Sequence, residues 1–583
     1  MNLGEILVRK GYLNEQELEE ALQNQRVSQE RVGAALVRLG LITEEQALEA
    51  LSEQLAIPYV QLSDITPEPH LLEMLPSRVV FRNQIFPVDL VDGRLLVATT
   101  DPLNIRLFDE LRTLVGREVE PVIASSRDIR TAISTYYGVG ADTVDTLMRE
   151  NGKKVDLLTT TEEALLSAGE DLSEPDERAT LIRFVNQILI EALGLRATDV
   201  HIEPFEKELQ VRYRVDGVLE EVNVPPEVKR FQNAIVSRIK IMAGLDIAEK
   251  RLPQDGRIRL NLGGREIDVR VSVIPMLYGE GVVLRLLDKA SLFFSLEQLG
   301  MDEHTLAMFR GLISRPHGIF LVTGPTGSGK TTTLYAALEK VRSPGLKIIT
   351  IEDPIEYQLD GVNQIQVHTS IGLNFAEGFR RVLRHDPDIV MVGEIRDRDT
   401  AEIAIQAAMT GHLVFSTLHT NDAVSSLTRL VHMGVEPYLV ASSVEGVMAQ
   451  RLVRVICPQC REEDRSAEHV AELEALTNRS DTKLWHGAGC QHCRNTGYYG
   501  RQGIFELVAI DDKIRDMVLE RAGSYQLKQY ATEHGARSLR QAAWLKVAAG
   551  VTTLAELYRV TKEDTVSTNG LPIVPEVAGG GGS

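Results

Sequence analysis

One stretch near the middle of the chain constrains the fold more than any other feature. The apolar run 319–322 is typical of a buried parallel strand, and the run 334–340 is compatible with a helix. The glycine-rich turn between them lets backbone N–H groups point at a polyphosphate, whose charge Lys330 would neutralise while Thr331 supplies a hydroxyl to Mg²⁺. A purely structural turn is the alternative, but the flanking strand and helix favour nucleotide binding. The predicted nucleotide-binding residues are Gly324, Pro325, Thr326, Gly327, Ser328, Gly329, Lys330, Thr331 and Thr332.

Three later apolar strands carry side chains that suit phosphate chemistry. Glu352 and Glu356 follow one strand, Glu394 follows the second, and His412 and His419 flank the third. Ligands of open parallel sheets collect at the carboxyl ends of the strands, so we expect these residues to converge on the phosphates. Single acids at strand ends are common without function, whereas several such ends after one phosphate loop favour a catalytic site.

Arginines alternate with apolar residues in strands that precede the phosphate loop. In residues 209–215 the apolar side chains face one way and Arg212 faces the other, and Arg270 and Arg285 lie in later apolar strands. Such arginines usually line a solvated sheet face. Beside a nucleotide site they are also candidates to reach the γ-phosphate from a neighbouring domain or subunit.

All four cysteines of the chain fall in two Cys-x-x-Cys pairs. The pairs are Cys457 with Cys460 and Cys490 with Cys493, and a 29-residue spacer separates them. Four thiolates at this spacing suit tetrahedral zinc better than four unpaired buried thiols. Because the thiolates fill the coordination sphere, we expect a structural rather than a catalytic metal.

Length and composition limit the class of protein. A chain of 583 residues is too long for one core and should divide into roughly three to five domains. We find no apolar run as long as a membrane span and no signal peptide, so we expect a cytoplasmic protein. The net charge of −20 opposes non-specific binding to nucleic acid, so no stable nucleic-acid partner is expected.

Two helical motifs repeat near the start of the chain, at residues 2–25 and 31–54. They align at an offset of 29, which places Gly4 on Gly33, and each reads as a helix, a glycine turn and a capped second helix. The pattern alone favours a helical docking module.

Four motifs together resemble the ATPases of the type II secretion and type IV pilus superfamily. They are Walker A at 324–331, the aspartate box at 351–357, Walker B at 392–397 and the histidine box at 410–423. The resemblance covers roughly residues 180–560. It implies a multidomain α/β protein with a RecA-like P-loop ATPase core, a preceding PAS-like α/β domain, a helical N-terminal repeat module and a tetracysteine zinc subdomain.

The resemblance also assigns roles to the candidate residues. It makes Glu394 the atypical Walker B acid that works with Mg²⁺ and the attacking water, and we favour Glu394 as general base over Glu352. Glu352 and Glu356 belong to the aspartate box, and His412 and His419 to the histidine box. The arginine set of the preceding domain comprises Arg212, Arg270 and Arg285.

The tandem motifs resemble a cyclic di-GMP-binding domain of some pilus and secretion ATPases, in which each motif begins Arg-Leu-Gly. Here the second motif begins Arg31-Val32-Gly33, whereas the first begins with Asn2. A guanidinium can bond guanine at O6 and N7, so the missing arginine weakens the case for this ligand. The tandem motifs are therefore predicted either to bind cyclic di-GMP or to serve as a simple docking module.

The function implied by the resemblance is ATP hydrolysis by a homohexameric ring that drives type II secretion pseudopilus assembly. The expected partners are an inner-membrane platform protein and the cytoplasmic domain of a membrane-anchored component, with peripheral association at the inner membrane. A type IV pilus extension ATPase regulated by cyclic di-GMP is the alternative within the superfamily. A nucleic-acid translocase and a non-catalytic nucleotide sensor are alternatives of other classes.

The predicted domain boundaries follow from these motifs and from changes in composition. A docking or cyclic di-GMP domain with a small α/β unit is followed by an acidic linker and the arginine-bearing domain. The ATPase domain, with its zinc-binding insertion, then leads to a helical region and a polar tail whose last residues resemble an artificial linker. In that order the ranges are 1–138, 139–178, 179–290, 291–510 with the insertion 455–500, 511–562 and 563–583.

Overall fold

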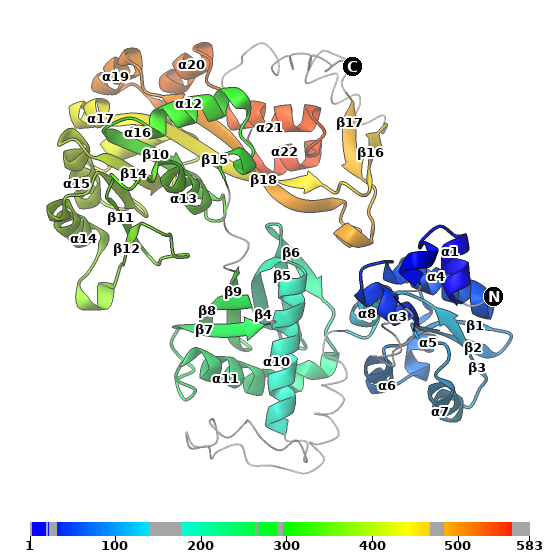
Figure 1. Ribbon diagram of the computed structural model, residues 1–583. Helices are drawn as coiled ribbons and strands as arrows, with labels where there is room; N and C mark the ends of the chain where they lie inside the picture. Colours follow the sequence, from blue (N-terminus) through cyan, green and yellow to red (C-terminus); the bar gives the residue numbers. More distant parts are fainter. Residues whose placement is uncertain are drawn as a thin grey trace, which may run out of the picture. The chain divides into compact units, whose positions relative to one another are not determined.

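The computed structural model describes residues 3–18, 21, 32–138, 177–262, 265–288, 295–466 and 483–562 (Figure 1). The predictions for Asn2, Arg31, the linker up to residue 176 and the tail from residue 563 lie outside these residues. The chain divides into two compact units, Met1–Leu287 and Asp288–Ser583.

The first unit begins with the helices of the tandem motifs. Thr43 caps the second helix of the second motif, because its hydroxyl accepts from the N–H of Gln46 while the Gln46 side chain accepts from the N–H of Thr43. Leu7 and Leu36 are fully buried between these helices. The helices are α1 (Leu3–Arg9), α3 (Val32–Arg38) and α4 (Glu44–Leu55).

A small α/β layer follows, as the alternation of short strands and helices predicts. Its three-stranded sheet has the order β1-β2-β3, antiparallel between β1 and β2 and parallel between β2 and β3. The elements are α5 (Pro69–Met74), α6 (Ser77–Asn83), β1 (Phe86–Val91), β2 (Arg94–Thr99), α7 (Ile105–Val115), β3 (Val119–Ile123) and α8 (Ser126–Tyr136).

The rest of the first unit is a six-stranded sheet of order β6-β5-β4-β9-β8-β7, against which α10 and α11 pack. On β5 the residues Leu209, Val211 and Tyr213 are buried, while Arg212 on the opposite face is half-buried. The elements are α10 (Glu177–Gly194), β4 (Ala197–Pro204), β5 (Leu209–Val215), β6 (Val218–Val222), α11 (Gln232–Ala243), β7 (Gln254–Leu262), β8 (Arg265–Met276) and β9 (Gly279–Asp288).

The second unit is built on a seven-stranded sheet of order β12-β11-β13-β14-β10-β15-β18, in which β18 alone runs antiparallel to its neighbour. Separate apolar cores cover its two faces, since Phe320 of β10 packs with α12 and α13 and Leu321 packs with α15 and the C-terminal helices. Buried on both faces, β10 is apolar along almost its whole length. The strands are β10 (Gly318–Thr323), β11 (Ile348–Glu352), β12 (Asn363–Gln366), β13 (Ile389–Val392), β14 (Leu413–Leu418), β15 (Val444–Ile456) and β18 (Tyr498–Ala509).

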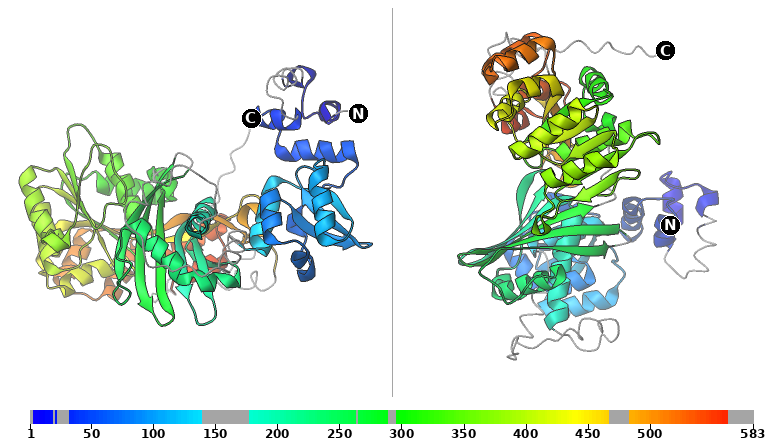
Figure 2. Two further views of the ribbon diagram at one scale, coloured as in Figure 1. Left: turned by 90° about the horizontal axis from the view of Figure 1, so that it is seen from below. Right: turned by 90° about the vertical axis from the view of Figure 1, so that its left-hand side faces the viewer.

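Helix α19 packs beside α17, and α20 packs against α19; both are orange in Figures 1 and 2. A two-stranded ribbon of β16 (Arg461–Asp464) and β17 (Leu484–Gly487) lies between β15 and β18 in sequence. Among the described residues, we find no helix with both the length and the apolar character to cross a bilayer. The helices are α12 (Glu303–Ile313), α13 (Lys330–Val341), α14 (Phe375–Val382), α15 (Arg398–Met409), α16 (Ser425–His432), α17 (Pro437–Ser443), α19 (Asp512–Leu519), α20 (Ser524–Glu533), α21 (Leu539–Ala548) and α22 (Leu554–Val560).

Candidate functional site

The glycine-rich turn joins the end of β10 to the start of α13. Gly324, Gly327 and Gly329 all have positive φ angles, of 149°, 78° and 87°. A Cβ on Gly324 would lie 2.6 Å from the carbonyl oxygen of Gln450 and 2.7 Å from Oγ of Ser328, so only glycine fits there. Because α13 begins at Lys330, its free N–H groups face the turn. The turn therefore has the geometry of a phosphate-binding loop.

The polar groups of the loop fit the phosphates of a nucleotide. Ser328 is 4% exposed, and its Oγ has no hydrogen-bond partner among the residues that the structure describes. Nζ of Lys330 donates to the carbonyl oxygens of Gly324 at 2.8 Å and Pro325 at 3.1 Å. Burial lowers the pKa of Lys330 to about 8, and the charge of Glu394 opposes this shift. A polyphosphate would meet both the hydroxyl and the cation, with half-buried Thr331 at the first turn of α13 for Mg²⁺.

Glu394 lies just beyond β13, beside the end of β14. Its carboxylate oxygen is 3.4 Å from Nε2 of His419, and Arg396 pairs with the other oxygen. Thr417 fixes this stretch, because its hydroxyl donates to the carbonyl oxygen of Gly393 at 2.7 Å. The structure therefore brings Glu394, the predicted Walker B acid, together with the imidazole of His419, and the charge of Glu394 acts on Lys330.

Glu352 ends β11 but is 3% exposed. One carboxylate oxygen accepts from Tyr335 of α13, and the other accepts from Thr350 at 2.5 Å and Gln364 at 3.1 Å. Burial raises the pKa of Glu352, and these three donors oppose the shift. Glu356, in the half-buried loop after β11, adds to the rise through its charge. The Glu352 carboxylate thus joins β11 to α13 and β12.

His412 lies away from the phosphate loop, so the expected convergence fails for this residue. Its Nδ1 lies 2.9 Å from the carbonyl oxygen of Ala407, and its own carbonyl oxygen accepts from the N–H of Gly318, the first residue of β10. The phosphate loop follows the last residue of β10, one strand length or roughly 20 Å away. The histidine box contains all of β14, so His412 lies at the amino end of this strand and His419 at its carboxyl end.

The three predicted arginines lie in the sheet of the first unit. Arg212 on β5 donates from Nε to Glu203 at 2.9 Å, and Arg285 on β9 donates from Nε to Asp199 at 2.9 Å. Arg270 lies on β8, opposite Arg257 of β7 in the strand register. The structure places these arginines in one sheet, and their contact with a γ-phosphate stays a prediction.

The four cysteines form one cluster at the far end of the β15–β18 arm, the paired segment of these two strands that extends beyond β10 to Ile456 and Tyr498. Their Sγ atoms all lie within 4.8 Å of one another. His492 stacks on Tyr499 with ring centroids 4.0 Å apart. The four-thiolate donor set fits tetrahedral zinc, as the spacing predicts. The metal would tie Cys457 and Cys460, which follow β15, to Cys490 and Cys493, which precede β18.

Zinc removal is the first test of this cluster. Protein purified without chelator is expected to contain about one zinc per chain, and chelation is expected to lower its melting temperature because the metal fixes the arm. Elemental analysis of a Cys490→Ser, Cys493→Ser double variant should show loss of the metal, whereas Gln459→Ala, an exposed change between two ligands, should retain it. Full zinc in the double variant would disprove the assignment.

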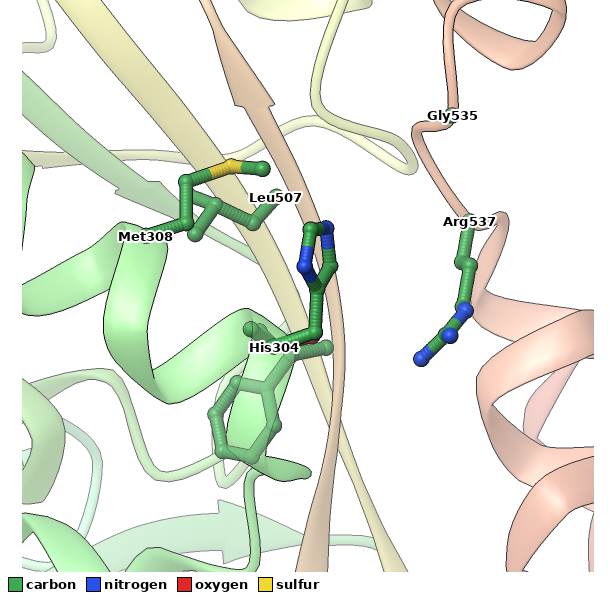
Figure 3. Close-up of a pocket in the computed structure, with 7 residues that line it drawn as sticks. His304, Met308, Leu507, Gly535 and Arg537 are labelled. Carbon is green, nitrogen blue, oxygen red and sulfur yellow. The ribbon is translucent and has the colours of Figure 1, made fainter. Parts of the chain in front are cut away.

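A small cavity lies apart from the phosphate loop, between α12, β18 and the loop that joins α20 to α21 (Figure 3). The guanidinium of Arg537, which lines the cavity, pairs with the Asp302 carboxylate at 3.0 Å, so an acidic residue of the protein already neutralises this charge. None of the predicted site residues lines the cavity. The residues labelled in Figure 3 are His304, Met308, Leu507, Gly535 and Arg537.

Two residues that contact the phosphate loop were not predicted from the sequence. Gln450 is 2% exposed, and its Oε1 accepts from the Thr333 hydroxyl of α13 at 2.8 Å. Arg451 follows it, with Nη1 3.1 Å from the position of a Cβ on Gly324. The available signal was a polar pair within the long apolar strand β15.

A phosphate loop at the head of α13, with an acid and an imidazole at the neighbouring strand ends, defines a P-loop ATPase core of the RecA-like α/β class. The chain belongs to the type II/IV secretion system protein family, whose model matches residues 174–559, and it is an ATPase of that family. A second model, the MshEN domain, matches residues 55–143 and begins directly after the tandem motifs. The first match confirms the resemblance of the core. The second match lies C-terminal to the tandem motifs, so the resemblance of the motifs themselves stays a prediction.

Relatives are similar over most of the chain. The type IV pilus assembly ATPase PilB of Myxococcus xanthus is 43% identical over 566 residues, which cover 96% of this chain and 99% of that protein. The type II secretion system protein E of Pseudomonas aeruginosa is 48% identical over 469 residues, covering 80% and 92%. Among solved structures, the ATPase DotB of Legionella pneumophila aligns with a TM-score of 0.48 at 21% identity, over 65% of this chain and 95% of that chain.

Proposed function

We propose that this ATPase is the motor that assembles a type II secretion pseudopilus through an inner-membrane platform protein. The observation that carries the proposal is the meeting of the phosphate loop, Glu394 and His419 at one sheet edge of a secretion-family core. The higher identity to type II secretion protein E, 48% against 43% for the pilus relative, supports secretion as the output.

The site residues suggest how ATP is cleaved. Lys330 and the N-terminus of α13 bind and neutralise the phosphates, and Thr331 offers its hydroxyl to Mg²⁺. Glu394 accepts the proton of the attacking water, because it lies beside Lys330 and His419. Glu352 acts as a positioning residue, since neutral donors already occupy both of its oxygens.

Arginines from the preceding domain would complete the site in a ring. We place Arg212, Arg270 and Arg285 at the γ-phosphate bound by a neighbouring domain or subunit of a homohexamer. Arg212 and Arg285 already form carboxylate pairs, and a phosphate would replace those partners. Closure would then couple hydrolysis to domain motion. The ring would act at the cytoplasmic face of the inner membrane, held there by the platform protein and a membrane-anchored partner.

Type IV pilus extension is the second candidate output. It is favoured by the pilus assembly relative, which matches 96% of this chain, whereas the secretion relative matches 80%.

Replacement of the host gene by a Lys330→Ala copy distinguishes the two outputs. We expect loss of extracellular protein secretion with surface pili intact, and a Lys340→Ala copy, changed at an exposed position of the same helix, should behave like wild type. Secreted proteins are measured in culture supernatant and pili by electron microscopy. Loss of pili alone would transfer the proposal to pilus extension, and loss of neither would disprove the motor role.

We also propose that the tandem N-terminal motifs bind cyclic di-GMP. The MshEN match directly after the motifs and Arg31 at the start of the second motif support this proposal. Calorimetry with the full-length chain should show binding that Arg31→Ala removes and that Arg38→Ala, an exposed change at the end of α3, retains. No heat up to high micromolar ligand would instead support simple docking.

A further inference from the structure

We propose that Arg451 is a further positioning residue for ATP hydrolysis, which holds the loop carrying His419 in register with the phosphate loop and adds a second fixed positive charge beside Lys330. The inference rests on the proposed roles of Lys330 and Glu394. Arg451 lies outside the four nucleotide-site motifs, at 324–331, 351–357, 392–397 and 410–423, and outside the predicted arginine set.

Strand pairing places Arg451 beside the phosphate loop. Strand β15 runs parallel to β10, with Thr323 opposite Ala449, so the next two residues of β15 continue alongside the start of the loop. Nη1 of Arg451 would lie 3.1 Å from a Cβ on Gly324 and donates to the carbonyl oxygen of Gln450 at 2.9 Å. A residue larger than glycine at position 324 would prevent the guanidinium and the loop from lying this close together.

The other end of the guanidinium reaches the histidine-box loop. Nη2 of Arg451 donates to the carbonyl oxygen of Asn421 at 2.9 Å, two residues after His419. The same loop is bonded to β10, because the hydroxyls of Thr420 and Thr323 lie 2.7 Å apart. Since His419 contacts Glu394 at 3.4 Å, a shift of this loop would displace the imidazole from the acid.

Charges around Arg451 come from both sides of the site. Burial lowers the pKa of Arg451, and the carboxylates of Glu506 on β18 and Asp422 in the histidine-box loop oppose the shift. Glu506 itself is buried and accepts from the N–H of Ala423 at 2.8 Å. Towards the phosphate loop, Arg451 contributes to the lowered pKa of Lys330, against the opposite effect of Glu394. A bound polyphosphate would relieve the repulsion between the two cations.

Substitutions separate the charge of Arg451 from its hydrogen bonds. Arg451→Gln removes the charge but can still donate to one carbonyl, Arg451→Lys keeps the charge but loses the planar fork, and Arg451→Met removes both. Arg310→Gln, a change on α12 that breaks a surface pair with Glu297, is the matched control. In the wild type, kcat/KM for ATP should fall as the pH rises through about 8, because Lys330 loses its proton in the free enzyme.

We expect Arg451→Gln and Arg451→Met to lower kcat about tenfold or more. In both variants the fall of kcat/KM at alkaline pH, here called the basic limb, should move to higher pH, since loss of the neighbouring cation raises the pKa of Lys330. Arg451→Lys should lower kcat with the limb unmoved, and Arg310→Gln should match wild type. Melting temperatures are measured in parallel.

If the basic limb of the kcat/KM profile does not move in Arg451→Gln and Arg451→Met, the residue is merely structural, whatever the value of kcat, and the proposal is overturned. An inactive wild type would overturn the proposed function itself, whereas active wild type with unchanged Arg451 variants overturns this inference alone.

Discussion

Lys330→Ala is expected to reduce ATP hydrolysis by the full-length protein at least about 10³-fold, because it removes the cation that neutralises the transferring phosphates. The side chain stands at the head of α13, where the carbonyl oxygens of its own loop hold it. Residues 324–331 contain no other lysine or arginine, so no other residue of the loop can supply the charge. Phosphate release at saturating Mg²⁺ and ATP measures the loss.

The matched control for this change is Lys340→Ala, an exposed lysine two turns or more along the same helix. The control should retain the wild-type rate, and both variants should keep their zinc content, because the cysteine cluster lies on the β15–β18 arm. If Lys330→Ala kept more than about a tenth of the wild-type rate, the assignment of the phosphate loop would be wrong.

Glu394→Gln is expected to bind ATP but to lower the single-turnover cleavage rate about 10²- to 10⁴-fold, because the amide cannot accept the proton of the attacking water. Rapid quenching of protein-bound ATP measures cleavage without interference from product release. His419 and Arg396 lose a charged partner in this variant, so its melting temperature is recorded beside the rate.

Glu352→Gln, a change at the proposed positioning residue, is compared with Glu394→Gln, a change at the proposed general base. Its amide would face the hydroxyls of Tyr335 and Thr350 and would leave buried donors poorly paired, at a cost of about 1–3 kcal/mol in stability. We therefore expect a lower melting temperature with single-turnover cleavage largely retained. The reverse result, in which Glu352→Gln abolishes cleavage and Glu394→Gln does not, would exchange the roles of the two acids.

The phosphate loop could be predicted from sequence because every part of it is local. A strand, three glycines and a helix start within one stretch fix the backbone, and the structure has this turn with Lys330 as the first helical residue. The meeting of Glu394 and His419 was also predictable, since the carboxyl ends of neighbouring parallel strands share one edge. The cysteine cluster followed from spacing and ligand chemistry alone.

The remaining features depend on which elements become neighbours. His412 shares a motif with His419, but six residues of strand separate the two imidazoles. Glu352 ends a strand as predicted, yet α13 supplies Tyr335 and covers it. Gln450 and Arg451 reach the phosphate loop only because β15 pairs with β10, a contact between segments far apart in the chain. Local patterns carry no signal for such pairings.

The most direct test of the central claim is a structure of the full-length protein with Mg²⁺ and a non-hydrolysable ATP analogue. The account predicts a triphosphate along the N–H groups of residues 324–331, with Nζ of Lys330 on its terminal phosphates and the Glu394 carboxylate facing the γ-phosphate across one water molecule. A nucleotide bound elsewhere, or a γ-phosphate that faces Glu352 with Glu394 turned away, would contradict it.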